Sequence, residues 1–331
     1  MLNLLNKLIF FFEQFYGSYW FSYIFRLRKS DQINATPDVR VFDQKIAIVM
    51  QGPVIERNDF TLETLKLYRK RFPFVPLILS TWDDLNEKVQ QKFEACNVQV
   101  IKNKKPDNSG VSNINFQIVS AKNGLLMAKE LGMEYCLRTR TDQRLYKHDF
   151  ISFFLSVLKT FPINSKQEHL NNRLIVPSLN TYKYRLYNPT DMLMFGSMDD
   201  MLLYWDCELD DRSKVEDAST LKDWSKLCYT EVYLLTNFLK KINHKIEWTL
   251  EDSWKVFAEY FCIVDKESLD LFWYKYDRTV ERRAYSNEFR HAREELYFSD
   301  WLNLYTGNLK SNDKLEKKVS SITFNSKLEI E

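Results

Sequence analysis

Glycine is scarce in this sequence, and the motifs that depend on it are missing. Only 7 of the 331 residues are glycine, and neither GxGxxG nor GxxxxGK[ST] occurs. These motifs place glycine where the backbone must approach a phosphate closely. Their absence disfavours dinucleotide-binding dehydrogenases and P-loop enzymes, and any bound phosphate must be held by other groups.

Cysteine and histidine are also few, and their spacing is typical of neither disulfides nor metal centres. The five cysteines are an odd number without a CxxC pair, and the four histidines stand outside any HExxH pattern. This disfavours a structural zinc site and a Cys/His nucleophile. We expect the cysteines to be buried, reduced thiols, as is typical of a cytosolic protein.

Neither sign of charge is in excess. The sequence has 47 Lys and Arg against 45 Asp and Glu, which gives a formal charge of +2. This balance disfavours a general nucleic-acid binder, which would be steered by a positive field. Hydrophobic residues make up 45% of the chain and aromatic residues 15%. That composition is typical of a folded protein whose core packs without disulfides.

The first 29 residues predict an amphipathic helix that associates with a membrane. The segment 1–25 is rich in Leu, Ile and aromatic residues, but a stripe of polar residues (Asn3, Lys7, Gln14, Ser18 and Ser22) recurs at helical spacing. A spanning helix would need about 20 mostly uninterrupted apolar residues. We therefore expect a helix in the headgroup layer, with Arg26, Arg28 and Lys29 facing anionic lipid. A helix docked on the protein's own core or in a dimer interface, or a true anchor, remain alternatives.

After a linker at 30–44, apolar runs alternate with segments of helical periodicity. The pattern predicts strands at 45–50, 76–82, 98–102 and 135–142, and helices at 60–71, at 85–95 and between Ser112, as a cap, and Gly132. Such alternation indicates an α/β fold with a mostly parallel sheet flanked by helices. Ligands of such sheets bind at the carboxyl ends of the strands.

Charged residues gather at the end of the fourth expected strand. Strand alternation would place Arg138, Arg140 and Asp142 on one face. Buried charges are rarely kept without partners. The three side chains therefore either bind an anionic ligand or form an internal salt-bridge cluster.

Several short motifs follow one another in a recognisable order. QGP follows the first strand, STW ends the second, Asn113-x-Asn115-x-Gln117 opens a helix, RTRTDQ ends the fourth strand, and PTDMLMFG lies at 189–196. In this order and spacing they resemble the WavE-type lipopolysaccharide synthesis family over about residues 45–240. The resemblance implies a GT-A-like (Rossmann-like) fold and a glycosyltransferase of lipopolysaccharide or capsular polysaccharide synthesis.

The family resemblance also implies partners, and together with the N-terminal helix and the pattern of the chain it gives an expected location and a division of the chain. The donor would be a nucleotide sugar, the acceptor an oligosaccharide or a lipid-linked saccharide, and the location cytoplasmic at the inner membrane. The expected parts are a nucleotide-sugar half (45–145), an acceptor half (146–250), a helical extension (251–309) and a flexible tail (310–331). A basic stretch within the extension, at 278–293, could touch a phosphorylated acceptor or be a solvated helix face.

GT-A enzymes generally hold a divalent ion on the donor diphosphate with an Asp-x-Asp motif. Here the corresponding residues are Arg140-Thr141-Asp142, so one carboxylate of that motif is replaced by a guanidinium. We expect Asp142 to hold Mg²⁺ or Mn²⁺ together with water and phosphate oxygens. In the alternative, Arg138 and Arg140 bind the diphosphate themselves and the metal is dispensable.

Five further residues are candidates for donor binding: Gln51, Gly52, Trp82, Asn113 and Gln117. Gln51 and Gly52 follow a strand and could contact the nucleotide or only form a turn. Trp82 could stack on the base or belong to the core. Asn113 and Gln117 stand one turn apart at a helix start, where a phosphate, a base edge or ordinary capping is favoured.

The acceptor half offers two carboxylates for catalysis. Inverting transfer needs a base to take the proton of the acceptor hydroxyl, and Asp191 and then Glu231 are the candidates. Either could instead be an ordinary turn or first-turn acid. The Tyr- and Asn-rich loop at 180–190 could form an acceptor-binding lip. A nucleotidyl- or sugar-phosphate transferase and an inactive scaffold remain alternative functions.

Overall fold

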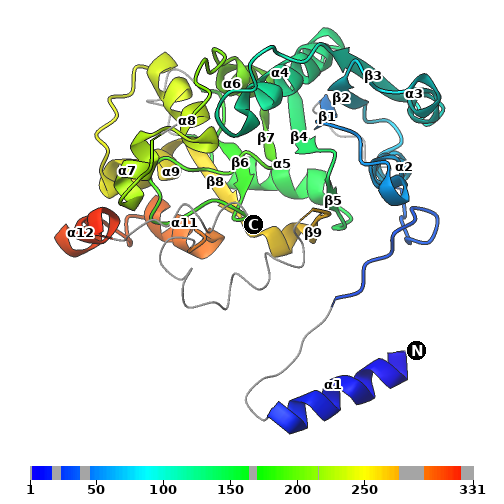
Figure 1. Ribbon diagram of the computed structural model, residues 1–331, viewed down its shortest axis with the longest axis horizontal. Coiled ribbons are helices and arrows are strands. Elements are labelled where there is room, and N and C mark those ends of the chain that lie inside the picture. The colour runs from blue at the N-terminus through cyan, green and yellow to red at the C-terminus, as the bar shows by residue number, and fades with distance from the viewer. Residues whose placement is uncertain are drawn as a thin grey trace.

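The computed structural model describes residues 2–16, 24–37, 45–163, 170–214, 216–275 and 294–321. Seven strands form one sheet (Figure 1). In spatial order they are β3 (Val98–Asn103), β2 (Leu77–Trp82), β1 (Ile46–Gln51), β4 (Tyr135–Arg140), β7 (Met194–Ser197), β6 (Leu174–Pro177) and β8 (Phe261–Val264). Only β7 runs antiparallel to its neighbours in this sheet. The expected α/β fold with a mostly parallel sheet is confirmed.

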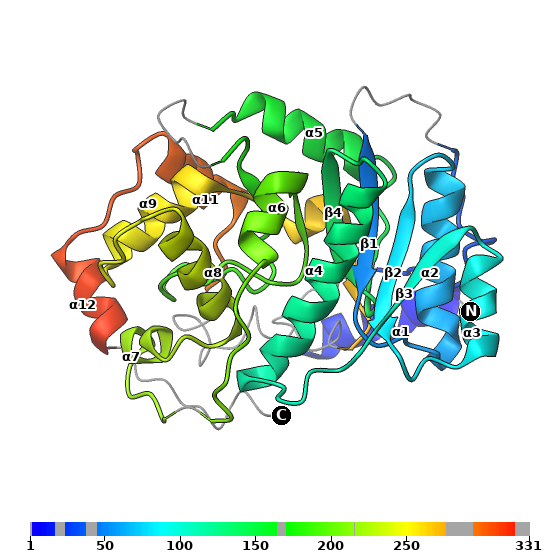
Figure 2. The ribbon, with the colours of Figure 1, turned by 90° about the horizontal axis from the view of Figure 1, so that it is seen from above.

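Helices cover both faces of the sheet. Figure 1 shows α4 (Ile114–Glu130) and α6 (Met198–Trp205) on one side, and α2 (Phe60–Arg71) and α5 (Phe150–Thr160) on the other. The short helix α3 (Glu87–Glu94) lies beside β3, as Figure 2 shows from above. Because both faces are covered, β1 and β2 are buried at every residue, which explains their continuous apolar sequence.

Helix α4 lies unusually close to the sheet. A Cβ atom at Gly124 would stand 2.4 Å from Cγ1 of Val49 in β1. Only glycine permits this approach. The contact holds the first turn of α4 near the carboxyl ends of β1 and β2, where the expected site lies.

The C-terminal part belongs to the same body as the sheet. It contains α7 (Leu221–Lys226), α8 (Thr230–Lys241), α9 (Leu250–Tyr260), α11 (Phe298–Tyr305) and α12 (Asp313–Ser321). Helix α9 leads directly into β8, the edge strand that pairs with β6. Trp301 of α11 donates hydrogen bonds to two backbone carbonyls at this junction. The expected boundary at residue 250 therefore falls inside the sheet domain, and α12 lies in the expected tail.

A small second sheet flanks the main one. Its two antiparallel strands are β5 (Gln143–Leu145) and β9 (Leu271–Trp273). Three short 3₁₀ helices complete the described elements: η1 (Arg57–Asp59), η2 (Val111–Asn113) and η3 (Lys266–Leu269). The second sheet brings residues after 270 back to the end of β4.

The N-terminal region consists of two different parts. Helix α1 (Leu2–Tyr16) stands apart from the body in Figure 1 and exposes large apolar side chains, with Phe15 73% exposed. Residues 24–37, part of which was expected to be a linker, contact the body instead. There Glu63 accepts hydrogen bonds from the backbone and side chain of Ser30, and Ile33 is buried. No helix of the described residues is long and apolar enough to cross a membrane.

Some sequence expectations fall outside the described residues. They are part of the polar stripe (Ser18 and Ser22), the part of the expected linker at 38–44, and the basic stretch at 278–293. All five cysteines are described and free, and Cys136, Cys207 and Cys262 are buried. Cys96 and Cys228 are only partly buried, so the expectation of buried thiols holds for three of the five.

Candidate active site

A cavity of about 590 Å³ opens at the carboxyl ends of β1, β2 and β4. Every predicted site residue except Arg138 lines it, namely Gln51, Gly52, Trp82, Asn113, Gln117, Arg140, Asp142, Asp191 and Glu231. These residues come from six separate stretches of the chain. The cavity thus brings together the two halves of the site that the sequence predicts.

The QGP turn and the end of β4 are tied together at the floor of this cavity. The backbone N–H of Thr141 donates to the carbonyl of Gln51 over 3.1 Å, and its hydroxyl donates to the carbonyl of Pro53 over 2.6 Å. Gly52 has a φ of +116°, and a Cβ there would stand 3.1 Å from Oγ1 of Thr141. Glycine is required by both the conformation and the space. The two motifs therefore form one structural unit.

Arg140 and Asp142 form a bidentate ion pair beside this unit. Nε and Nη2 of Arg140 donate to Oδ1 and Oδ2 of Asp142 over 2.9 and 3.0 Å, and Trp273 donates to Oδ2 over 3.0 Å. Because β4 ends at Arg140, Asp142 reaches its partner through a turn and not by strand alternation. Burial alone would raise the pKa of Asp142, but attraction to Arg140 and these hydrogen bonds lower it.

The two candidate catalytic carboxylates, Asp191 and Glu231, also affect the pKa of Arg140. Burial disfavours its charge, yet Asp142, Asp191 and Glu231 together outweigh burial and raise the pKa of Arg140. The cavity is also lined by Lys105 and Lys275. The site therefore holds cationic and anionic groups side by side, an arrangement suited to a phosphate next to a reacting hydroxyl.

The residues around Asp142 do not fit a metal site built by the protein alone. Both oxygens of Asp142 already accept hydrogen bonds from Arg140. Among the described residues, no group of three or more His, Cys, Asp or Glu side chains could hold a metal ion. A divalent ion usually takes six or more oxygen ligands. Mg²⁺ or Mn²⁺ would here need nearly all of its ligands from the donor and from water, and its presence stays a prediction.

Arg138 lies behind the cavity wall and does not contact the cavity. Its side chain is fully buried, with the guanidinium carbon 4.2 Å from the ring centroid of Trp205. It donates to the backbone carbonyl of Asp191 and, over 3.3 Å, to Oε1 of Gln117. Burial lowers the pKa of Arg138 to about 9, so the group stays charged at neutral pH. The structure thus differs from the expected phosphate contact, and Arg138 instead holds two residues of the cavity in place.

The donor-side candidate residues differ in burial, in side-chain hydrogen bonds and in backbone conformation. Trp82 is 5% exposed and meets Phe116 edge to face at 5.3 Å, so its ring belongs largely to the core. The side-chain carbonyl of Gln51 accepts a hydrogen bond from Ser120. Ser112 and Asn113 both adopt left-handed backbone conformations, with φ of 53° and 63°, and neither caps α4 through its side chain. Such conformations in non-glycine residues cluster at functional sites.

The acceptor side is more enclosed than the sequence suggests. Asp191 is 4% exposed and lies just before β7, while Glu231 lies in the first turn of α8. The loop at 180–190 is largely buried, since Tyr187 packs edge to face against Trp248 and donates to Asp252. Of that loop only Asn180 lines the cavity. The loop is therefore part of the core and not an exposed lip.

Sequence reasoning missed the contribution of β9 and the residues next to it. Trp273 and Lys275 line the cavity although they lie about 130 residues after Asp142. Their segment carries no motif in the sequence. A single short strand that pairs with β5 brings them to the site, and no local signal predicts such pairing.

Comparison with known proteins finds remote likeness in structure. A cytidylyltransferase from Leptospira borgpetersenii matches with 11% identity over 85% of this chain and 99% of its own, with a TM-score of 0.34. Core-mannan synthase A from Aspergillus fumigatus, in a Mn/GDP form, matches with 9% identity over 76% of this chain and 81% of its own, with a TM-score of 0.31. These likenesses are too distant to indicate a reaction.

No curated protein matches this chain. One family does: the family described as WavE lipopolysaccharide synthesis matches residues 46–328. That range contains the whole sheet, both halves of the cavity and the segment after residue 250. The chain therefore belongs to the WavE lipopolysaccharide synthesis family.

Proposed function

We propose that this protein is a glycosyltransferase that moves a sugar from a nucleotide-sugar donor to a saccharide acceptor in lipopolysaccharide or capsular polysaccharide synthesis. The observation that carries the proposal is the single cavity lined by both the donor-side and the acceptor-side candidates. Its position at the carboxyl ends of parallel strands is the usual ligand position in such sheets. Membership of a lipopolysaccharide synthesis family supports the biological role.

In this proposal the donor diphosphate lies against Arg140. Nε and Nη2 of Arg140 point at Asp142, so the carboxylate fixes the plane of the guanidinium. Lys275 lines the same cavity and adds positive charge for the leaving nucleoside diphosphate, and Lys105, which pairs with Asp84, lines it too. The start of α4 and the amides of Asn113 and Gln117 are available to the nucleotide. Arg138 acts as a positioning residue for Gln117 and Asp191.

Asp191 or Glu231 then serves as the general base. In an inverting transfer, the acceptor hydroxyl attacks the anomeric carbon, the bond from that carbon to the diphosphate breaks, and the carboxylate takes the hydroxyl proton. The products are the glycosylated acceptor, the nucleoside diphosphate and a protonated carboxyl group. Asp191 is the first candidate because its backbone is fixed by Arg138.

The proposed location is the cytoplasmic surface of the inner membrane. The exposed apolar side chains of α1, including Phe10, Phe11 and Phe15, support an interfacial helix. Deleting residues 2–16 tests this more sharply than a longer truncation, because Arg144 binds the backbone carbonyl of Arg28 and holds that segment to the body. The full chain should sediment with vesicles containing phosphatidylglycerol, and the deletion variant should not. Equal sedimentation would contradict the membrane role.

The reaction is tested by incubating the protein with a panel of nucleotide sugars and saccharide acceptors. Release of a nucleoside diphosphate supports sugar transfer. Release of a nucleoside monophosphate or of pyrophosphate would instead indicate transfer of a sugar phosphate or a nucleotidyl group. No nucleotide binding by calorimetry, with or without Mn²⁺, would indicate an inactive scaffold and overturn the proposal.

A further inference from the structure

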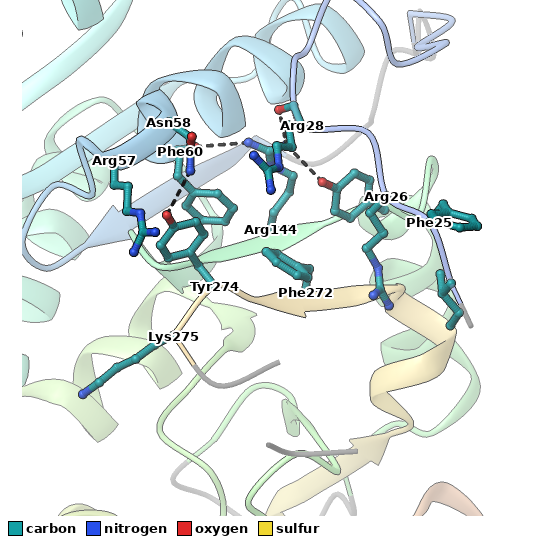
Figure 3. Close-up of a pocket in the computed structure, with 12 residues that line it drawn as sticks. Phe25, Arg26, Arg28, Arg57, Asn58, Phe60, Arg144, Phe272, Tyr274 and Lys275 are labelled. Carbon is teal, nitrogen blue, oxygen red and sulfur yellow. Dashed lines mark hydrogen bonds between the residues drawn. The ribbon is translucent and has the colours of Figure 1, made fainter. Parts of the chain in front are cut away.

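A second cavity, of about 830 Å³, lies next to the proposed active site. Four parts of the chain form it: the segment 24–28, the turn before α2, β5, and β9 with the residues that follow (Figure 3). Lys275 lines both this cavity and the first one. The two cavities are therefore neighbours, and a ligand in the second can extend toward the first.

The lining of the second cavity is basic. Among the residues that the structure describes, its charged lining residues are Arg26, Arg28, Arg57, Arg144 and Lys275, without an Asp or Glu. Arg26 forms an ion pair with Asp270 over 2.9 Å. Within the part of the chain that the structure describes, neither Arg28 nor Arg57 has a carboxylate partner. Both side chains are exposed and can meet an anion from solution.

Arg144 holds the cavity together and is not itself available. It is 1% exposed and donates to Thr64, to the hydroxyl of Tyr146 and to the backbone carbonyl of Arg28 over 2.9, 3.1 and 2.7 Å. These bonds fix the backbone that carries Arg28 against β5. Arg28 is thus carried by backbone that is held to the body and not by a free strand of chain.

Aromatic rings form the rest of the wall. The rings of Phe60 and Tyr274 are 4.7 Å apart, and those of Phe60 and Phe272 are 5.9 Å apart. Figure 3 shows these three rings between the side chains of Arg57 and Arg26. Asn58 donates to the Tyr274 hydroxyl over 3.2 Å from a left-handed backbone conformation. A non-glycine residue held in this conformation indicates a turn under local strain.

This combination suits one chemical class of ligand. Flat aromatic faces pack against the apolar face of a sugar ring, and unpaired guanidinium groups bind phosphate oxygens with charge-assisted hydrogen bonds. A cavity of this volume is large enough to enclose a drug-sized ligand. Inorganic phosphate alone would leave the aromatic wall unused, and a neutral saccharide would leave the arginines unused.

We propose that the second cavity binds a phosphorylated saccharide, the acceptor of the transfer reaction, with its phosphate on Arg28 and Arg57. The inference rests on the proposed function and adds the chemical class of the acceptor. Because Lys275 lines both cavities, the unphosphorylated end of the saccharide would lie toward Asp191 and Glu231.

Calorimetry on the full chain tests the proposal, with glucose 1-phosphate as the probe. We expect glucose 1-phosphate to bind, inorganic phosphate to bind at least about tenfold more weakly, and methyl glucoside not to bind detectably. The double variant Arg28→Gln/Arg57→Gln should weaken binding of glucose 1-phosphate by about tenfold or more, the loss typical of removing charge-assisted hydrogen bonds. Lys245→Gln, an exposed charge that lines neither cavity, should change it by less than about twofold.

Competition separates the two cavities. Saturating uridine, guanosine or cytidine diphosphate, tested in turn, should leave the binding of glucose 1-phosphate unchanged. Displacement would place both ligands in one site and overturn the inference while supporting the proposed function. If no nucleotide binds, the proposed function fails, whereas the second cavity is judged by the double variant alone.

Three other results would overturn the inference. The double variant could bind glucose 1-phosphate normally while it unfolds thermally like the wild type. Inorganic phosphate could bind as tightly as the sugar phosphate, which would indicate a general anion site. Vesicles of phosphatidylglycerol could bind the double variant much more weakly than the wild type while glucose 1-phosphate binds neither, which would assign the arginines to lipid headgroups.

Discussion

The two neighbouring cavities differ in how their charged side chains are paired. In the first, Arg140 is paired with Asp142 and lies near two further carboxylates, so each charge has a counterpart. In the second, no Asp or Glu is among the described lining residues, and Arg28 and Arg57 have no carboxylate partner within the described part of the chain, although Arg26 pairs with Asp270. Paired charges fix geometry, and unpaired charges attract ligands. We infer that the first cavity is built to position reacting groups and the second to capture an anion.

Substitution of Asp191 and Glu231, the proposed catalytic carboxylates, should give the largest effect on activity. A small effect would contradict the inference that the first cavity positions reacting groups. We expect Asp191→Asn to lower kcat by about 10² to 10⁴-fold, the usual contribution of a general base, with little change in donor affinity. Glu231→Gln should have the same effect if Glu231 is the base instead. Steady-state kinetics with the identified donor measure both variants.

A matched control is Glu208→Gln, an exposed carboxylate that does not line the cavity. It should retain the activity of the wild type. If Asp191→Asn and Glu231→Gln both remain as active as this control, the first cavity does not supply the base. Its charge balance would then be structural.

Removing Arg140 should have the second largest effect. Arg140→Ala should weaken donor binding by about 1.5 to 3 kcal/mol, the value of a charge-assisted hydrogen bond to a phosphate. Arg140→Lys should not restore it, because an ammonium group cannot reproduce the planar fork that Asp142 holds in place. Calorimetric titration with the donor nucleotide measures both variants. Full rescue by lysine would show that Asp142 does not orient the cation.

The ion pair of the first cavity should also appear in the pH dependence of stability. The pKa of Asp142 in the folded protein lies below the ordinary value of 3.8 because Arg140 and Trp273 outweigh the effect of burial. The carboxylate therefore stabilises the fold fully above that ordinary value, and its contribution is lost as the pH falls through the lower, folded-state pKa. Asp142→Asn should cost most stability at neutral pH and least in acid.

Chemical denaturation at a series of pH values measures this difference. Asp83→Asn, at an exposed position outside the cavity, supplies the baseline. A gap between wild type and Asp142→Asn that stays constant from neutral pH to acid would show that the ion pair does not contribute to folding. The Arg140–Asp142 ion pair would then add nothing measurable to the free energy of unfolding.

The parts of the molecule that sequence could predict are those with local signals. The first two strands are mainly apolar and buried at every residue, since both faces of the sheet are covered there. The motifs at their ends converge in one cavity, because parallel strands end at the same edge. Asp142, in contrast, lies in a turn, and its pairing with Arg140 follows from the turn and not from strand alternation.

Residues whose position depends on long-range contacts could not be predicted from the sequence. Strand β9 has only three residues and gains its place through pairing with β5, more than 120 residues earlier in the chain. Nothing in its sequence indicates that Trp273 will donate to Asp142. The burial of Arg138 was unpredictable for the same reason, because its partner Trp205 lies on a helix far along the chain.

Removal of metal ions should have the smallest effect on turnover. It tests directly whether arginine or a metal ion supplies the positive charge in the first cavity. Both oxygens of Asp142 are engaged by Arg140, and the described residues contain no cluster of metal-binding side chains. The guanidinium of Arg140 stands where a metal-binding carboxylate would otherwise be expected, and under the proposed function it supplies positive charge to the diphosphate. We therefore expect chelation with EDTA to change turnover by less than about threefold, since the protein offers few of the oxygen ligands that a divalent ion requires.

Turnover in EDTA and after addition of Mn²⁺ is the measurement. Loss of activity in EDTA with full recovery in Mn²⁺ would mean that the donor brings its own ion to Asp142, and the first cavity would then work through metal charge and not through arginine.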